Sequence, residues 1–135
     1  MDAKPPAGVT VRPARRTELP EVRNVIDGAA LALEHGRLRR ALETGDVLVA
    51  ATEAVVVGAL VLADDEVTAV AVRPGRRGQG IGRALVEAAA AGRDRLVAEC
   101  DERVAGFWRA LGFELESCGD SRMGGRRVNA ERAPS

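Results

Sequence analysis

The chain has 135 residues, of which 46% are hydrophobic and 30% charged, and these proportions are those of a single globular domain with an ordinary core. Its 20 basic and 20 acidic residues cancel, so no overall field favours nucleic acid or anionic lipid. Cys100 and Cys118 form neither a Cys-x-x-Cys pair nor a cluster with histidines, which argues against a metal site or a disulfide framework.

The chain opens with a polar, proline-containing lead, residues 1–8, that we expect to be flexible. The lead lacks the apolar stretch of a signal peptide, and no later window is apolar for long enough to span a membrane. We therefore expect a cytoplasmic protein with no membrane partner. A strand-like run at residues 9–12 begins the domain, which we place at residues 9–128, and residues 129–135 form a tail.

Helical periodicity follows the first strand. Thr17 is suited to cap a helix with Pro20 in its first turn, and one face of this helix carries apolar residues at helical spacing: Leu19, Val22, Ile26 and Ala29. A second helical stretch runs from about residue 33 to residue 42. We expect Gly36 to interrupt this stretch and Gly45 to end it.

Strand-like runs come next, at residues 46–51, 54–63 and 66–72, and short turns separate them. This spacing predicts an antiparallel meander. A glycine-rich stretch then leads to a helix at residues 83–91 and an apolar strand at residues 95–100. This later strand should lie parallel to the strand that precedes the helix.

The last predicted helix has an apolar side formed by Val104, Phe107, Trp108 and Leu111, and it stops at Gly112. Closing strands are expected at residues 113–116 and 122–128. The order of these elements predicts an α/β (α+β) fold in one domain, with a mixed, mostly antiparallel sheet flanked by helices.

Residues 66–83, EVTAVAVRPGRRGQGIGR, read as a strand, a glycine-rich turn and the first turn of a helix. The first amides of a helix have no partner within it, and the helix dipole places positive charge there. Glycines let a ligand approach the backbone closely, and Arg76, Arg77 and Arg83 add charge to the same place. The stretch therefore predicts a binding site for a phosphate-bearing ligand.

Two common phosphate-binding loops fit this stretch poorly. A Walker loop needs Gly-Lys-Ser/Thr before the helix, but Lys4 is the only lysine in the chain. A dinucleotide-binding turn needs Gly-x-Gly-x-x-Gly within a repeated β-α-β unit. Here Arg83 and Ala84 follow Gly80 and Gly82, and no second unit is present.

The stretch instead resembles the signature of the GCN5-related N-acetyltransferase (GNAT) superfamily, Gln/Arg-x-x-Gly-x-Gly/Ala, with Arg77, Gly80 and Gly82 at the defined positions. A second segment, FWRALGF at residues 107–113, resembles the Phe-Tyr-x-x-x-Gly-Phe segment of the same family. The resemblance implies the GNAT fold and an N-acetyltransferase activity that uses acetyl-CoA. In such an enzyme a primary amine attacks the thioester directly in a ternary complex, without a covalent enzyme intermediate.

The resemblance also implies which residues bind the cofactor. The end of the strand, Val70, Ala71 and Val72, should offer backbone groups to the pantetheine arm of coenzyme A. The turn that follows should cradle the diphosphate with its amides, and it consists of Arg77, Gly78, Gln79, Gly80, Ile81, Gly82 and Arg83. No metal is expected.

Trp108 is the main departure from the family pattern, because the family commonly has a tyrosine there that is assigned to protonating the departing thiolate. The chain has no tyrosine, and an indole N–H donates a hydrogen bond without acting as an acid. The acid role is left unassigned; Cys100 is an alternative donor, and a buried structural cysteine is its competing interpretation. The missing tyrosine keeps open a second function, a non-catalytic acyl-CoA-binding or sensor module.

The attacking amine must be neutral, so a base is needed, and some family members use a glutamate at the position of Glu66. Strand alternation puts Glu66, Thr68, Val70 and Val72 on one side, unless the strand carries a bulge. A solvated turn residue is the other interpretation of Glu66. His35 is a weaker candidate base, and a surface residue at a helix end is its alternative.

The acceptor should be a small-molecule or peptide amine, and the sequence does not narrow it further. The acidic residues 64–66 would attract a cationic amine, whereas Arg37, Arg39 and Arg40 would attract an acidic substrate, so the two inferences cancel. Nucleic acid is not an expected partner, because there is neither a basic excess nor interleaved aromatic residues. The oligomeric state is left open, a homodimer included.

Overall fold

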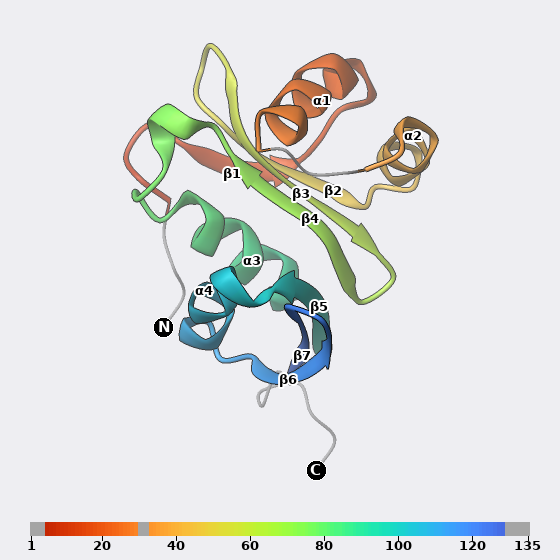
Figure 1. Cartoon of the computed structure of the whole chain (residues 1–135). Coiled ribbons are helices and arrows are strands. Elements are labelled where there is room, and N and C mark those ends of the chain that lie inside the picture. The colour runs from red at the N-terminus through yellow and green to blue at the C-terminus, as the bar shows by residue number, and fades with distance from the viewer. Residues whose placement is uncertain (1–4, 30–32, 129–135) are drawn as a thin grey trace.

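The computed structural model describes residues 5–29 and 33–128, which fold around a seven-stranded sheet in the order β1-β2-β3-β4-β5-β7-β6 (Figure 1). The strands are β1 (Thr10–Pro13), β2 (Val47–Ala51), β3 (Val56–Ala63), β4 (Glu66–Val72), β5 (Arg95–Asp101), β6 (Glu114–Gly119) and β7 (Arg122–Val128). The α-helices are α1 (Leu19–Gly28), α2 (His35–Glu43), α3 (Ile81–Ala91) and α4 (Ala105–Ala110), and the short 3-10 helices are η1 (Arg16–Glu18), η2 (Pro74–Arg76) and η3 (Glu102–Val104). The predicted tail and residues 1–4 of the predicted lead lie outside the described residues.

The strands of the sheet form two antiparallel groups. β2 to β4 make the predicted meander, and β1 extends this group by pairing with β2. β5, β7 and β6 make the second group. The two groups meet where β4 lies parallel to β5, and α3 connects these two strands along the chain, as the sequence predicted. The mixed, mostly antiparallel sheet flanked by helices is therefore confirmed.

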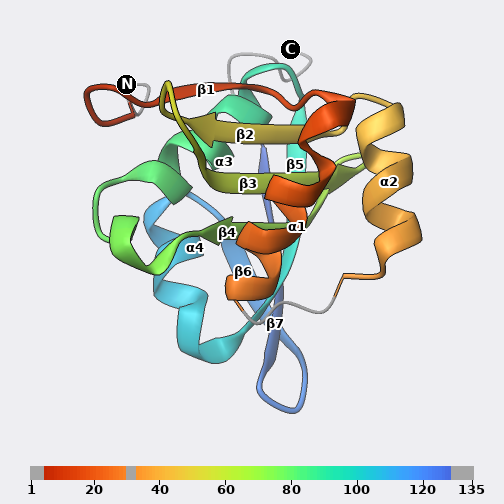
Figure 2. The same ribbon diagram turned by 90° about the horizontal axis from the view of Figure 1, so that it is seen from above.

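Helices cover both faces of the sheet, and each face has its own hydrophobic core (Figures 1 and 2). We call the core under α1 and α2 the α1-side core; in it Val22 and Ile26 of α1 are fully buried. The α3-side core lies on the other face and includes Leu85 of α3 and Trp108 of α4. Each fully buried side chain of this size stabilises the fold by about 1.5 to 3 kcal/mol.

The helices begin differently from the predictions. α1 begins at Leu19, after η1, and Thr17 is not its cap; the carboxylate of Glu18 instead accepts a hydrogen bond from the backbone N–H of Arg15 at 2.8 Å. Pro20 lies in the first turn of α1, as predicted. The break expected at Gly36 is wrong: α2 begins at His35, so Gly36 falls in its first turn and does not interrupt the interior of the helix.

α4 is shorter than the predicted helix and buries only part of the expected apolar side. Trp108 and Leu111 are buried, but 49% of Val104 and 37% of Phe107 are exposed. Val104 precedes the first residue of α4, so the helical spacing does not extend to it. Gly112 follows the helix with φ +88°, a left-handed conformation that suits the predicted glycine stop.

β4 carries a bulge at Thr68. Val67 and Ala69 pair with consecutive residues of β3, which leaves Thr68 as the extra residue of the ladder. A bulge of this kind shifts the alternation of side chains by one position. Val67 therefore belongs to the α3-side core, together with the partly buried Val70, whereas Ala69 belongs to the α1-side core.

The bulge changes the side of the sheet to which Glu66 belongs. Adjacent residues of a strand face opposite sides, so Glu66 faces away from Val67 and thus away from Val70 and Val72. The expected row of Glu66, Thr68, Val70 and Val72 on one side does not form, because the bulge that this expectation excluded is present.

Candidate functional site

β4 and β5 separate soon after they begin. Their ladder joins Glu66 to Val97 and Val67 to Ala98 and ends there, although each strand has 7 residues. The other edge of β4 pairs with β3, and the other edge of β5 pairs with β7. We call the diverging part, residues 68–72 and 99–101, the β4–β5 fork. Its facing edges have backbone groups without a strand partner, to which an extended ligand with amide groups can pair.

The loop that follows β4 leaves a run of backbone amides unused. The N–H groups of residues 78–83 donate to no acceptor within the described part of the chain. The N–H of Arg77 donates to the carbonyl of Pro74 at 3.4 Å, so the free amides begin one residue later than predicted. α3 begins at Ile81, and its N-cap, Gly80, has no side chain to occupy the first amides. These amides are therefore available to an anion.

Two of the loop glycines are required by the backbone conformation. Gly78 has φ +80° and Gly80 has φ +86°, which are left-handed values that other residues rarely adopt. A Cβ at either position would meet nothing within 4 Å, so open space lies above the loop. Gly82 differs, because it is helical and a Cβ there would lie 3.4 Å from the ring of Phe107 and 3.8 Å from Cγ2 of Val72.

Several arginine side chains lie in and beside the loop, and they differ in whether they make hydrogen bonds within the protein. Nε of Arg73 donates to the carbonyl of Val56 at 2.7 Å and fastens the start of the loop to β3. Arg83 lies in the first turn of α3 and has no hydrogen bond or ion pair among the described residues. No acidic residue lies in the loop sequence, so the positive charge there is not compensated locally.

Val70, Ala71 and Val72 form the end of β4, on one arm of the fork. Val70 and Val72 pack partly buried against the α3-side core, and Ala71 is buried in the α1-side core. Nε of Arg77 donates to the carbonyl of Val72 at 3.2 Å. Because a carbonyl oxygen has two lone pairs, Val72 keeps one for a ligand in the fork.

Glu66 lies at the closed end of the fork, away from the loop. It is the first residue of β4, it is exposed, and it neighbours Val97 of β5. A strand rises about 3.3 Å per residue, so Glu66 lies roughly 20 Å from Val72 along the strand. The structure therefore places the candidate base and the candidate phosphate loop at opposite ends of one strand.

The aromatic residues pack together beside the loop. Trp108 makes edge-to-face contacts with Phe107 at 5.2 Å and with Phe113 at 5.0 Å between ring centroids. The indole N–H of Trp108 makes no hydrogen bond within the described residues. Among these residues, the only fully buried side-chain nitrogen or oxygen without a partner is Nε of Arg23. The indole N–H is therefore not fully buried and keeps contact with solvent.

The contact of Phe107 with Gly82 was missed by the sequence reasoning, which placed Phe107 in the core. In the sequence, only the glycine at position 82 indicated this contact.

Cys100 is buried in the α3-side core, and burial raises the pKa of its thiol. This favours the structural interpretation of Cys100. His35 is exposed at the first position of α2, which favours its interpretation as a surface residue at a helix end, although it begins the helix and does not close one.

Among residues 5–29 and 33–128, no group of 3 or more His, Cys, Asp or Glu residues is placed to hold a metal ion. The same residues contain no helix with the length and apolar character needed to cross a bilayer.

Comparisons with known proteins agree on one fold. Rv2747 from Mycobacterium tuberculosis, in complex with CoA and NLQ, has a TM-score of 0.75 at 21% identity, covering 89% of this chain and 99% of its own. N-acetylglutamate synthase from Neisseria gonorrhoeae, complexed with coenzyme A and L-arginine, has a TM-score of 0.73 at 18% identity, covering 92% of this chain and 34% of its own. PaiA N-acetyltransferase from Thermoplasma acidophilum, in complex with coenzyme A, has a TM-score of 0.70 at 14% identity, covering 90% of this chain and 99% of its own.

The sequence comparisons differ in what they find. No curated protein matches the chain. The family model of the acetyltransferase (GNAT) domain matches residues 43–115, which is more than half of the 135 residues and includes both segments that carried the resemblance. The chain therefore belongs to the GNAT acetyltransferase domain family and is an acyltransferase.

Proposed function

We propose that the chain is an N-acetyltransferase that transfers the acetyl group of acetyl-CoA to a primary amine by direct attack in a ternary complex. The observation that carries this proposal is the run of free N–H groups at residues 78–83, next to the open edges of the β4–β5 fork. Three proteins of the same fold, described above, were solved with coenzyme A, which supports the same cofactor here.

The residues present fit this cofactor. The amides of residues 78–83 suit a diphosphate, because they combine unused donors with the positive end of the α3 dipole, and Arg83 adds a charge. The edge of β4 at Val70, Ala71 and Val72 suits the amide groups of the pantetheine arm, which would lie along the strand. When bound, acetyl-CoA supplies the acetyl group as an activated thioester.

Within this proposal Glu66 takes the proton from the ammonium form of the acceptor, directly or through a water molecule. Its carboxylate is exposed at the closed end of the fork and faces the side of the sheet opposite to Val70 and Val72. The loop and α3 lie on the side of Val70 and Val72. Cofactor and acceptor would thus reach the closed end of the fork from opposite faces of the sheet.

Trp108 serves as a hydrogen-bond donor in this proposal. Its indole N–H makes no hydrogen bond within the described chain, and its ring contacts Phe107, which in turn lies beside Gly82. A donor can stabilise the charge that develops on the leaving thiolate without giving up its proton. The thiolate then takes its proton from water.

A non-catalytic acyl-CoA-binding module is the second candidate. The observation in its favour is that the chain has no tyrosine and carries Trp108 at the position of the usual acid. The free amides and the fork would serve this function equally well. The two candidates differ only in whether an amine acceptor is consumed.

Thiol release from acetyl-CoA, followed against small-molecule and peptide amines, separates the two functions. For Glu66→Gln we expect kcat/KM near neutral pH to fall roughly a hundredfold to ten-thousandfold, because the base is removed. Cofactor affinity should not change. The chain has 1 tryptophan and no tyrosine, so quenching of intrinsic fluorescence by coenzyme A reports on Trp108 alone and measures this affinity without turnover.

Glu116→Gln is the matched control, since Glu116 is an exposed glutamate on β6. Cofactor binding without thiol release for any amine would establish the binding module. Turnover with an unchanged pH profile in Glu66→Gln would show that another group is the base.

A further inference from the structure

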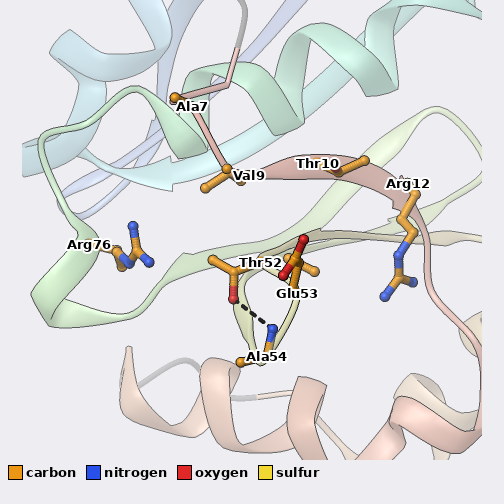
Figure 3. Close-up of a pocket in the computed structure, with 10 residues that line it drawn as sticks. Ala7, Val9, Thr10, Arg12, Thr52, Glu53, Ala54 and Arg76 are labelled. Carbon is orange, nitrogen blue, oxygen red and sulfur yellow. Dashed lines mark hydrogen bonds between the residues drawn. The ribbon is translucent and has the colours of Figure 1, made fainter.

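A groove of about 710 Å³ lies at the end of the sheet where β1 begins and β2 turns into β3 (Figure 3). Its walls come from residues 7–10 and Arg12, from the turn at residues 51–54, and from Arg76 at the end of η2. Volumes of this size are typical of small-molecule sites. The groove contains neither the free amides of residues 78–83 nor Glu66, so it is separate from the proposed acetyltransfer site.

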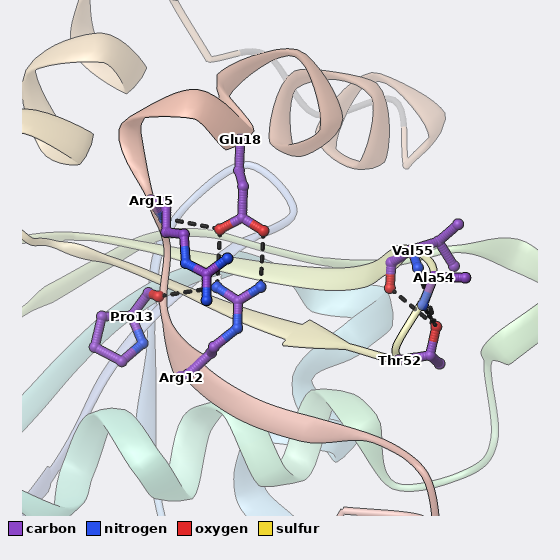
Figure 4. A network of polar contacts seen from close by, with 7 residues as sticks. All are labelled: Arg12, Pro13, Arg15, Glu18, Thr52, Ala54 and Val55. Atoms are coloured by element: carbon purple, nitrogen blue, oxygen red, sulfur yellow. Dashed lines mark hydrogen bonds and ion pairs between the residues drawn. The ribbon is translucent and has the colours of Figure 1, made fainter.

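Several polar groups around the groove are already committed to the fold. Arg12 forms a two-pronged ion pair with Glu18, with both N–O distances at 2.8 Å, so its charge is balanced (Figure 4). The hydroxyl of Thr52 accepts the backbone N–H groups of Ala54 and Val55 at 3.2 and 3.1 Å and thereby holds the turn. These groups shape the groove and are not free to bind a ligand.

Arg76 and Glu53 are the charged groups of the groove that remain unpaired. Within the described residues, the side chain of neither makes a hydrogen bond or an ion pair, and Arg76 is partly buried. Figure 3 shows the guanidinium of Arg76 entering from the η2 side and the carboxylate of Glu53 entering from the turn between β2 and β3. A partly buried guanidinium is stabilised by an anionic partner, and no residue in the described part of the chain is paired with Arg76.

The charge pattern identifies the class of ligand. One positive and one negative group enter from different walls, and the buried apolar residues Val9 and Ala51 also line the groove. A simple anion would meet the carboxylate of Glu53, and a simple cation would meet Arg76. We propose that this groove binds a small zwitterion, an α-amino acid or short peptide, with its carboxylate on Arg76 and its ammonium group on Glu53.

Binding of L-leucine, N-acetyl-L-leucine and L-leucinamide to the full chain tests the site. Heteronuclear NMR of the labelled protein, with no acyl-CoA present, reports both the affinity and the place of binding, and its result does not depend on the proposed acetyltransfer. We expect saturable binding of L-leucine, with shifts confined to the backbone of residues 51–54 and 76. The two capped ligands should bind at least about tenfold more weakly, because each lacks one charge-assisted contact.

Two substitutions test separately the contact to the carboxylate and the contact to the ammonium group of the ligand. Arg76→Gln should bind L-leucine and L-leucinamide equally weakly, since the contact to the carboxylate is gone. Glu53→Gln should likewise fail to distinguish L-leucine from N-acetyl-L-leucine. Arg39→Gln and Glu43→Gln make the same changes in charge at exposed positions of α2 and should retain the affinity of the wild type.

Three results would each overturn the proposal. One is the absence of saturable binding, or shifts that map elsewhere. The second is equal affinity for all three ligands. The third is displacement of L-leucine by adenosine diphosphate, which would make the groove part of the cofactor site. The NMR spectra of the variants also show whether they are folded, so a loss of binding cannot be confused with unfolding.

Discussion

Trp108 stands where related acetyltransferases commonly have a tyrosine, and its chemistry limits the proton transfers available to the enzyme. An indole N–H does not titrate in the accessible pH range. We therefore expect kcat/KM to rise with pH as the acceptor loses its proton and then to stay level, because no acid has to remain protonated. A pH–rate profile between about pH 6 and pH 10 measures this.

Two substitutions isolate the role of Trp108. Trp108→Tyr should add a falling limb near pH 10, because a phenol acts as an acid only while it is protonated. Trp108→Phe keeps an aromatic ring without the donor, and it should lower kcat roughly tenfold to hundredfold. A falling limb in the wild type, or full kcat in Trp108→Phe, would contradict the assignment. Thermal unfolding of each variant monitors the packing of position 108 against Phe107 and Phe113.

Gly80 and Gly82 have different backbone conformations, so replacing each by alanine should affect stability differently. Gly80→Ala should destabilise the fold by about 1 to 2 kcal/mol, because alanine is strained at φ +86°. Gly82→Ala should be neutral or stabilising by up to about 1 kcal/mol, since position 82 is helical and a methyl group fits beside Phe107 at 3.4 Å. Urea unfolding of the two variants measures the difference. Equal losses of stability in the two variants would show that the left-handed backbone at position 80 does not require glycine.

At the scale of elements, the ion pair between Arg12 and Glu18 fastens β1 to the start of α1. The hydrogen bonds from Arg12 are the main reason why the pKa of Glu18 is lowered to about 2. An unfolded glutamate has a pKa of about 4.3, so the unfolded chain holds this proton more tightly than the folded chain. The stabilisation is therefore complete above about pH 5 and is lost as the pH falls towards 2.

Glu18→Gln should lower the free energy of unfolding at pH 7 by on the order of 2 to 3 kcal/mol, because the charged partner of Arg12 is removed. Urea unfolding at several pH values measures this. The difference between wild type and variant should shrink as the pH falls below about 4. Glu116→Gln, at an exposed position on β6, provides the control. A difference that persists undiminished at the lowest pH would exclude the ionised carboxylate as its source.

Most strands could be predicted because their residues alternate or are β-branched over several positions. The third strand of the meander matches its predicted range, residues 66–72, and the last strand matches residues 122–128. The bulge at Thr68 could not be predicted, because Thr68 follows the strand pattern as well as its neighbours do. The side of the sheet on which Glu66 lies depends on this bulge. This side therefore could not be predicted from the sequence either.

At the scale of the whole molecule, the loop was predictable because its conformation depends on local sequence. Gly78 and Gly80 adopt left-handed values, and the helix begins next to them, as a glycine-rich turn before an apolar helix indicates. Contacts between distant segments were not predictable in the same way. The approach of Phe107 to Gly82 joins α4 to α3, and the groove at Arg76 joins three separate segments.

The proposed acetyl transfer depends on the binding of the diphosphate of coenzyme A by the free amides of residues 78–83. A crystal structure of the chain with coenzyme A tests it most directly. We expect diphosphate oxygens within about 3.2 Å of several of these nitrogen atoms, with the pantetheine arm running along β4 into the fork. A diphosphate bound elsewhere, with these amides still unoccupied, would show that the loop is not the binding site.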